Sequence, residues 1–167
     1  DKKEIRFIDN GIGMTDEEVR KYINQIAFSG AQDFLEKYKD KMDEGSQIIG
    51  HFGLGFYSAF MVADRVQIDT LSYRKGASAV RWISSGGMDY EMDASDRTER
   101  GTTVTLYVSE DSLEFLDEFK MREILRKYCE FMPYEIYLEI EDKKDKKSEA
   151  EAKPINDTNP LWLKNPK

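Results

Sequence analysis

The chain has 167 residues, which is about the length of one domain and long enough to bury a core. Its 33 acidic and 25 basic residues give a formal net charge of -8, and charged residues make up 35% of the sequence. Proteins that bind nucleic acids typically carry a basic surface, so this balance argues against a nucleic-acid partner. The single cysteine, Cys129, excludes an intramolecular disulfide.

Neither the apolar runs nor the start of the chain indicates a membrane protein. The longest apolar run, at 57–63, is too short to span a bilayer. The first residues lack the hydrophobic stretch of a signal peptide. We therefore expect no membrane partner and a cytoplasmic location. The chain begins at Asp1 rather than at Met, so we expect a fragment or a processed product.

The first third of the chain predicts one strand followed by helices. Alternating apolar residues predict a strand at 5–8, which ends in a turn signal at 9–11. Thr15 and Glu18 form a capping box, which predicts the start of a helix whose apolar positions extend to Ala27. Further helices are expected at 31–39 and, as a buried helix, at 56–62.

The apolar period then changes to two, which is typical of half-buried antiparallel strands. These strands are expected around 66–68, 80–82, 88–92 and 104–108, with a hairpin turn at 85–87. One or two helices at 115–128 and a last strand at 136–140 complete the pattern. The predicted fold is an α+β, two-layer sandwich: a mostly antiparallel sheet with helices on one face.

A charged segment separates this body from the end of the chain. Ten of the thirteen residues at 141–153 are charged, five acids and five lysines, and the segment has no net charge. Its only apolar side chains are those of two alanines, which are too small to offset the entropy of ordering, so we expect a solvated linker. We accordingly predict a nucleotide-binding domain at 1–140, a linker at 141–153 and the start of another domain at 154–167.

Six of the eleven glycines fall in three short motifs that could carry chemistry. The first is Asp9-Asn10-Gly11-Ile12-Gly13-Met14-Thr15. A carboxylate at a strand end, followed by glycines, suits a ligand amine such as that of adenine. An Asx turn that merely closes the strand explains the same residues.

The second motif is Gly50-His51-Phe52-Gly53-Leu54-Gly55-Phe56, at the entrance to a predicted helix. Glycines let backbone N–H groups approach an anion, and a helix N-terminus favours negative charge. The alternative is a tight turn that needs glycine. The spacing matches neither the P-loop nor the Rossmann fingerprint, because His51 stands where a P-loop has its lysine.

The third motif is Arg100-Gly101-Thr102-Thr103, at the start of a predicted strand. Its hydroxyl groups can bond a ligand, or they can simply suit a strand.

In this order and spacing the three motifs resemble those of the GHKL ATPases, which include gyrases, histidine kinases, mismatch-repair proteins and heat-shock chaperones. The run Gly50-x-Phe52-Gly53-Leu54-Gly55-Phe56-Tyr57-Ser58-Ala59-Phe60 and the sequence Ile26-Ala27-x-Ser29-Gly30 are most similar to the 90-kilodalton heat-shock protein chaperones, in particular the bacterial high-temperature protein G branch. The resemblance extends over almost the whole chain, from Ile5 to Trp162.

The resemblance implies an ATP or ADP site. Asp9 would accept the adenine amine, Gly13 and Met14 would line the base pocket, and Thr102 would bond the base side through water. The residues that would cradle the phosphates are Gly50, Phe52, Gly53, Leu54, Gly55 and Phe56. The segment 28–49 matches the lid of the family, which closes over nucleotide and excludes water.

The catalytic glutamate of the family and its magnesium-holding asparagine lie upstream of the first motif, and no residue of this chain matches either. We therefore assign no catalytic or metal-binding residue here, expect the Mg²⁺ ligand to lie upstream, and expect the chain by itself to be inactive as an ATPase. The parent protein is expected to be an ATP-hydrolysing homodimer that acts on unfolded client proteins. Two alternatives stay open: another GHKL enzyme, such as a histidine kinase or topoisomerase, and an interaction module with a vestigial pocket.

Overall fold

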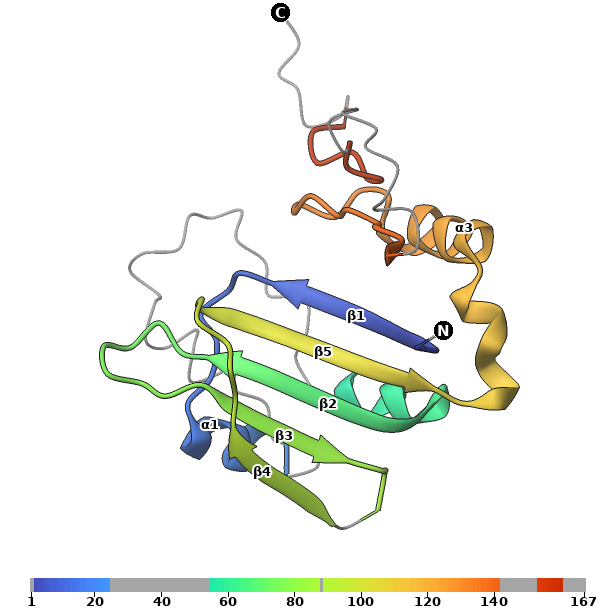
Figure 1. Ribbon diagram of the computed structural model, residues 1–167. Helices are drawn as coiled ribbons and strands as arrows, with labels where there is room; N and C mark the ends of the chain where they lie inside the picture. Colours follow the sequence, from blue (N-terminus) through green and yellow to red (C-terminus); the bar gives the residue numbers. More distant parts are fainter. Residues whose placement is uncertain (1, 25–54, 88, 142–152, 161–167) are drawn as a thin grey trace, which may run out of the picture. The chain divides into compact units, whose positions relative to one another are not determined.

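The computed structural model describes residues 2–24, 55–87, 89–141 and 153–160, which form two compact units divided between Ser112 and Leu113. The first unit is built on one five-stranded sheet, in which every neighbouring pair is antiparallel and the order is β1-β5-β2-β3-β4 (Figure 1). Its strands are β1 (Glu4–Asp9), β2 (Ala63–Leu71), β3 (Val80–Ser84), β4 (Tyr90–Ala94) and β5 (Gly101–Val108).

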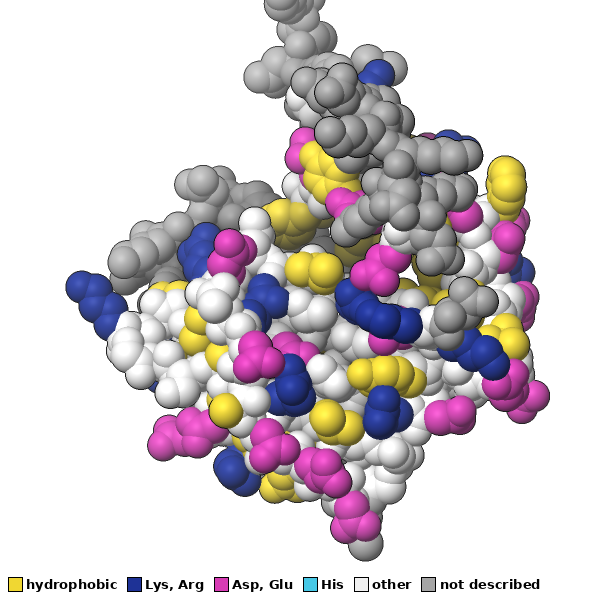
Figure 2. Space-filling view, viewed as in Figure 1, with side chains coloured by type: hydrophobic (Ala, Val, Ile, Leu, Met, Phe, Trp, Pro, Cys, Tyr) yellow, Lys and Arg dark blue, Asp and Glu magenta, His cyan; other side chains and the backbone are white. Residues whose placement is uncertain are grey.

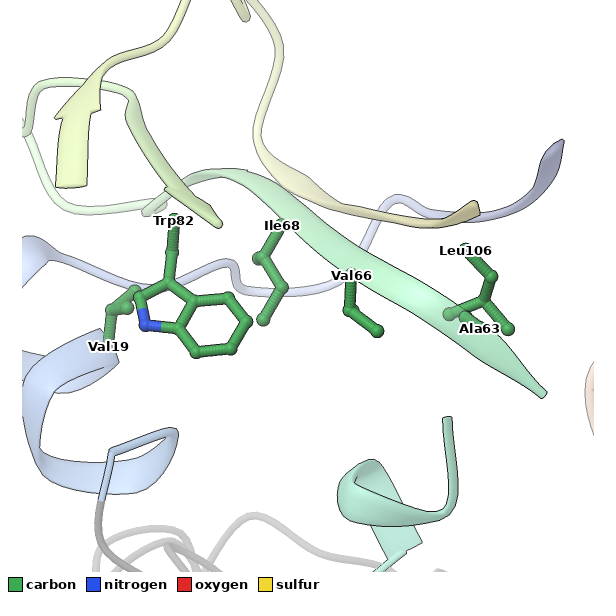
Figure 3. Packing of buried hydrophobic residues seen from close by; sticks show 6 residues of the cluster. All are labelled: Val19, Ala63, Val66, Ile68, Trp82 and Leu106. Carbon is green, nitrogen blue, oxygen red and sulfur yellow. The ribbon is translucent and has the colours of Figure 1, made fainter. Parts of the chain in front are cut away.

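Two helical segments lie against the same face of this sheet, behind the strands in the view of Figure 1. They are α1 (Asp16–Tyr22) and the 3₁₀ helix η2 (Gly55–Met61). The buried cluster in Figure 3 joins them to the strands: Val19 of α1 meets side chains from β2, β3 and β5. Its members are Val19, Ala63, Val66, Ile68, Trp82 and Leu106. The predicted α+β sandwich with helices on one face is therefore confirmed.

The beginning of α1 follows the sequence pattern. Thr15 accepts a hydrogen bond from the backbone N–H of Glu18, and the Glu18 carboxylate accepts one from the N–H of Thr15, so the capping box is confirmed. The helix is shorter than its apolar period indicates, since it ends at Tyr22. The predicted helix at 31–39 and the predicted lid at 28–49 lie entirely outside the described residues.

The prediction of a buried helix at 56–62 is wrong in two respects. The segment Gly55–Met61 is a 3₁₀ helix, and none of its residues is fully buried. Only one side of it rests on the sheet, where Phe56, Ala59 and Phe60 pack against the core, while Met61 is 82% exposed. One supporting layer can cover only one side of a helix, so an apolar sequence alone did not ensure burial.

The second unit contains the end of η3 (Glu110–Leu116) and α3 (Glu118–Cys129), as the two-segment pattern indicated. Asp117 caps α3 by accepting a hydrogen bond from the Lys120 N–H. The ranges predicted for the domain, the linker and the following domain stay predictions.

The last strand, predicted at 136–140, is wrong, because no strand forms there. The buried side chain of Asn156 binds the backbone at the start of this segment and just before it. Its amide group donates to the carbonyls of Met132 and Tyr134, and its Oδ1 accepts from the N–H of Ile136. An alternating apolar pattern needs a partner strand to form a ladder, and here Ile136 is bonded instead by the Asn156 side chain and by the backbone N–H of Ile155.

Candidate functional site

The first and third sequence motifs meet at one end of the sheet. Asp9, the last residue of β1, pairs with Thr102 of β5, and Thr102 pairs on its other side with Thr70 of β2. Each of the three lies an even number of residues from a core residue of its own strand: Ile5 in β1, Ile68 in β2 and Val104 in β5. Side chains alternate between the two faces of a strand, so all three share the face covered by α1 and η2. The fold therefore brings together two motifs separated by about 90 residues of sequence and adds a third residue that neither contains.

The Asp9 carboxylate is anchored through one oxygen. Its Oδ1 accepts hydrogen bonds from the N–H of Gly11 at 2.8 Å and from the N–H of Thr102 at 3.2 Å. Among the described residues no hydrogen bond reaches Oδ2, and Asp9 is exposed. The Asx turn and the acceptor role are thus compatible: one oxygen closes the turn, and the other remains able to accept a hydrogen bond from a ligand amine.

Thr70 is the site residue that the sequence reasoning missed. It is 1% exposed, and its hydroxyl accepts from the Met14 N–H at 2.9 Å and lies 3.2 Å from the Gly101 carbonyl and 3.0 Å from the Thr102 hydroxyl. Its position offers a signal in retrospect, because it continues the core-facing series Val66 and Ile68 with a polar residue. A buried polar side chain in a core series needs partners, and here these are residues of both motifs.

The acceptor of the Thr70 hydroxyl proton decides which of the two threonines donates the hydrogen bond between them. A hydroxyl donates only one hydrogen bond, so if Thr70 donates to the Gly101 carbonyl, Thr102 must donate to Thr70. The oxygen of Thr102 then keeps its lone pairs as acceptors. This suits a half-buried residue expected to bond the base side through water.

Gly13 and Met14 are held against the end of β2 by a close crossing of two backbones. Gly13 has φ +62°, and a Cβ built on it would lie 1.9 Å from the Leu71 carbonyl oxygen. The crossing is fixed by a hydrogen bond from the Tyr73 N–H to the Ile12 carbonyl at 2.8 Å. Glycine is therefore required at position 13 both for its conformation and for its lack of a side chain.

Only the end of the second motif lies in the described residues. The Phe56 ring packs on the Trp82 ring, with centroids 5.6 Å apart, so its side chain serves the core. Gly55 is exposed, and a Cβ there would meet nothing within 4 Å. The other expected phosphate-binding residues, Gly50, Phe52, Gly53 and Leu54, lie outside the described residues.

A separate groove of about 580 Å³ crosses the opposite face of the sheet and contains none of the predicted site residues. Figure 2 shows this face, where basic and acidic side chains intermix. Both of its acidic residues are paired, Asp69 with Arg81 at 2.8 Å and Glu4 with Arg6, while Arg97, which also lines it, donates to backbone carbonyls. We regard it as a solvated face rather than the site, because a ligand would have to compete with these contacts.

The Asp69 carboxyl on this face has a lowered pKa. Burial favours the neutral form and would raise the pKa, but hydrogen bonds from Ser95, Gln67 and Arg81 outweigh that effect. The groove is thus held together by an ionised carboxylate at neutral pH.

Within the parts of the chain that the structure describes, no three His, Cys, Asp or Glu side chains are grouped so that they could hold a metal ion. In the same parts, every helix is too short or too polar to cross a lipid bilayer.

Residues 1–112 match the family described as histidine kinase-, DNA gyrase B-, and HSP90-like ATPase, and the chain belongs to this family. The chain is also 50% identical, over 168 residues, to chaperone protein HtpG of Bacteroides thetaiotaomicron, with 99% of the chain and 24% of that protein covered. It is 48% identical to chaperone protein HtpG of Porphyromonas gingivalis, with 97% and 24% covered. It is 41% identical to chaperone protein HtpG of Halorhodospira halophila, with 96% of the chain and 26% of that protein covered. The chain thus spans about a quarter of the length of these relatives.

Proposed function

We propose that this chain is the ATP-binding module of an ATP-dependent molecular chaperone that assists protein folding. The observation that carries the proposal is the row formed by Asp9, Thr102 and Thr70 across three strands on the helix-covered face. A carboxylate oxygen and a hydroxyl oxygen lie there as acceptors, as the amine of adenine and its bound water require. The family match and the chaperone relatives support this assignment.

The acidic character of the chain bears on how a nucleotide would be held. With a net charge of -8, the protein does not attract a polyphosphate by its overall field. The phosphates would have to be bound by local donors, and the backbone at 50–56 would supply them. Mg²⁺ would neutralise phosphate charge, and the family resemblance would place its protein ligand on the motif upstream of Asp9.

In the complete protein, nucleotide binding and hydrolysis would drive the conformational cycle of a homodimer that acts on unfolded or partly folded clients in the cytoplasm. Neither nucleic acid nor a membrane is a proposed partner. These features belong to the proposal and rest on the chaperone relatives, of which the chain spans about a quarter.

Calorimetric titration with ADP and measurement of phosphate release together test the proposed function. We expect the full-length protein to bind ADP and to release phosphate from ATP. The 167-residue chain alone should not exceed the background rate, because none of its residues matches the catalytic glutamate of the family. Failure of the full-length protein to bind ADP or ATP would refute the module's assignment, and turnover by the isolated chain would refute its inactivity.

A further inference from the structure

The guanidinium group of Arg97 binds the backbone of Asp9. Arg97 lies between β4 and β5 and is half-buried. Its Nη2 donates to the Asp9 carbonyl at 3.1 Å and to the Arg100 carbonyl at 3.4 Å. Its Nε donates to the Glu99 carbonyl at 2.8 Å, and its Nη1 donates to the Thr103 hydroxyl at 2.6 Å. One planar cation thus joins the end of β1 to the loop before β5 and to β5 itself.

These contacts use the charge of Arg97 for the backbone rather than for an ion pair. Among the described residues no carboxylate lies within ion-pair distance of Arg97, and three of its four acceptors are main-chain carbonyls. Arginine suits this task because its donors are fixed in one plane and its charge is permanent. An arginine that only faced water would make no such contacts, so we infer that the Arg97 guanidinium has a structural task.

Close packing beside Arg97 shows that the junction tolerates little displacement. Gly101 has φ +115°, and a Cβ there would lie 2.2 Å from the Asp9 carbonyl oxygen and 3.0 Å from Arg97 Nη2. The Asp9 residue is therefore held at two points: Arg97 holds its carbonyl, and the N–H groups of Gly11 and Thr102 hold its carboxylate. Fixing the peptide plane at the strand end fixes the direction in which the side chain leaves the backbone.

We propose that Arg97 is a positioning residue for the adenine-binding carboxylate. It keeps the end of β1 in place so that Oδ2 of Asp9 is presented to the exocyclic amine of the base. The proposal rests on the proposed function, and it concerns recognition of the base rather than of the phosphates.

The test compares two ligands that differ only at the exocyclic amine: ADP and purine riboside 5′-diphosphate, which lacks that amine. Affinities are measured by calorimetry on the full-length protein, and the ratio of the two cancels the phosphate contribution. Wild-type protein should prefer ADP by about tenfold or more, as expected when an acceptor that the bound base shields from water loses its donor. In Arg97→Ala the preference should fall to about twofold or less, because a mispositioned acceptor recovers little of that energy.

Two further variants separate positioning from a general structural effect. Arg97→Lys should keep an intermediate preference, because an ammonium group can reach one carbonyl but cannot match the planar array of donors. Arg100→Ala, three residues further along the same loop, should keep the wild-type ratio, since only its backbone carbonyl takes part in the described contacts.

An unchanged ratio in folded Arg97→Ala would overturn the inference, even if both affinities fell equally, because that outcome marks a purely structural role. If Arg97→Ala does not fold, Arg97→Lys decides: a reduced ratio supports positioning and a wild-type ratio overturns it. If wild-type protein binds nucleotide without preferring ADP, the base-recognition role of Asp9 fails and the inference fails with it. If it binds neither ligand, the proposed function itself fails.

Discussion

The hydroxyl groups of Thr70 and Thr102 lie 3.0 Å apart across the β2–β5 ladder, and through them the core of the sheet is bonded to its candidate site. Thr70 also accepts from the N–H of Met14, so a single buried oxygen joins the segment after β1 to the start of β5. The stability of the sheet end and the geometry of the site therefore depend on the same residue.

Thr70→Val should destabilise the protein by about 1–3 kcal/mol, because the Met14 N–H loses its acceptor in a partly buried place. Urea unfolding measures this change. Combined with Thr102→Val in a double-mutant cycle, it should show a coupling of about 0.5–3 kcal/mol. Thr105→Val, a threonine-to-valine control in β5, should lower the free energy of unfolding by less than Thr70→Val, since no hydrogen bond of the Thr105 hydroxyl is described. Additive effects of the Thr70 and Thr102 variants would contradict a shared hydrogen bond.

Asp9→Asn should abolish nucleotide binding in the full-length protein. The amide keeps the shape of the carboxylate but replaces one acceptor oxygen with a donor, which repels the amine of adenine. Calorimetric titration with ATP is the measurement. Asp93→Asn, which removes an exposed carboxylate of β4, is the matched control and should bind normally. Nearly unchanged affinity of Asp9→Asn would rule out the adenine-binding role.

Gly13→Ala should destabilise the protein by about 2–5 kcal/mol, since it combines backbone strain with a clash against a main-chain carbonyl. Gly76→Ala is a close control, because Gly76 also has a positive φ, of +79°, but a Cβ there would meet nothing within 4 Å. It should cost only about 1–2 kcal/mol, the price of the left-handed conformation. Equal losses, measured by thermal or urea unfolding, would show that the crossing at Leu71 is not tight.

The lowered pKa of Asp69 predicts a dependence of stability on pH. A carboxyl whose folded-state pKa lies below its ordinary value of 3.8 contributes stability above that value and loses it as pH falls through the folded-state pKa. Asp69→Asn should therefore be less stable than wild type at pH 7, and the difference should shrink in acid below the ordinary value. Melting temperatures across this range give the comparison. A difference that stays constant with pH would mean that the charge of Asp69 does not stabilise the fold.

Local patterns in the sequence were sufficient for much of the fold. The strands followed from alternating apolar residues, and the start of α1 followed from the capping box of Thr15 and Glu18. The family followed from three glycine motifs, and the match to residues 1–112 confirms it. The roles of the individual site residues stay predictions.

Other features depended on partners far away in sequence. The segment 136–140 formed no strand, and its first residue, Ile136, is bonded instead by the Asn156 side chain and the Ile155 N–H. The depth to which η2 is buried was decided by its packing on the sheet, which among the described residues takes up Phe56, Ala59 and Phe60 and leaves Met61 exposed. Neither outcome is encoded in the local apolar period, which reports which side chains seek burial but not which surfaces are available to cover them.

The acidic composition and the order of the glycine motifs by themselves determined the class of protein and excluded a general electrostatic attraction for nucleotide. Only the tertiary structure decided how the site is held. The Thr70 hydroxyl bonds the Gly101 carbonyl next to it, and Arg97, 88 positions after Asp9 in the sequence, binds the Asp9 carbonyl. The physical reason is that motifs record the groups that would touch a ligand. The residues that hold those groups in place are selected by proximity in the folded sheet, which no spacing along the chain reveals.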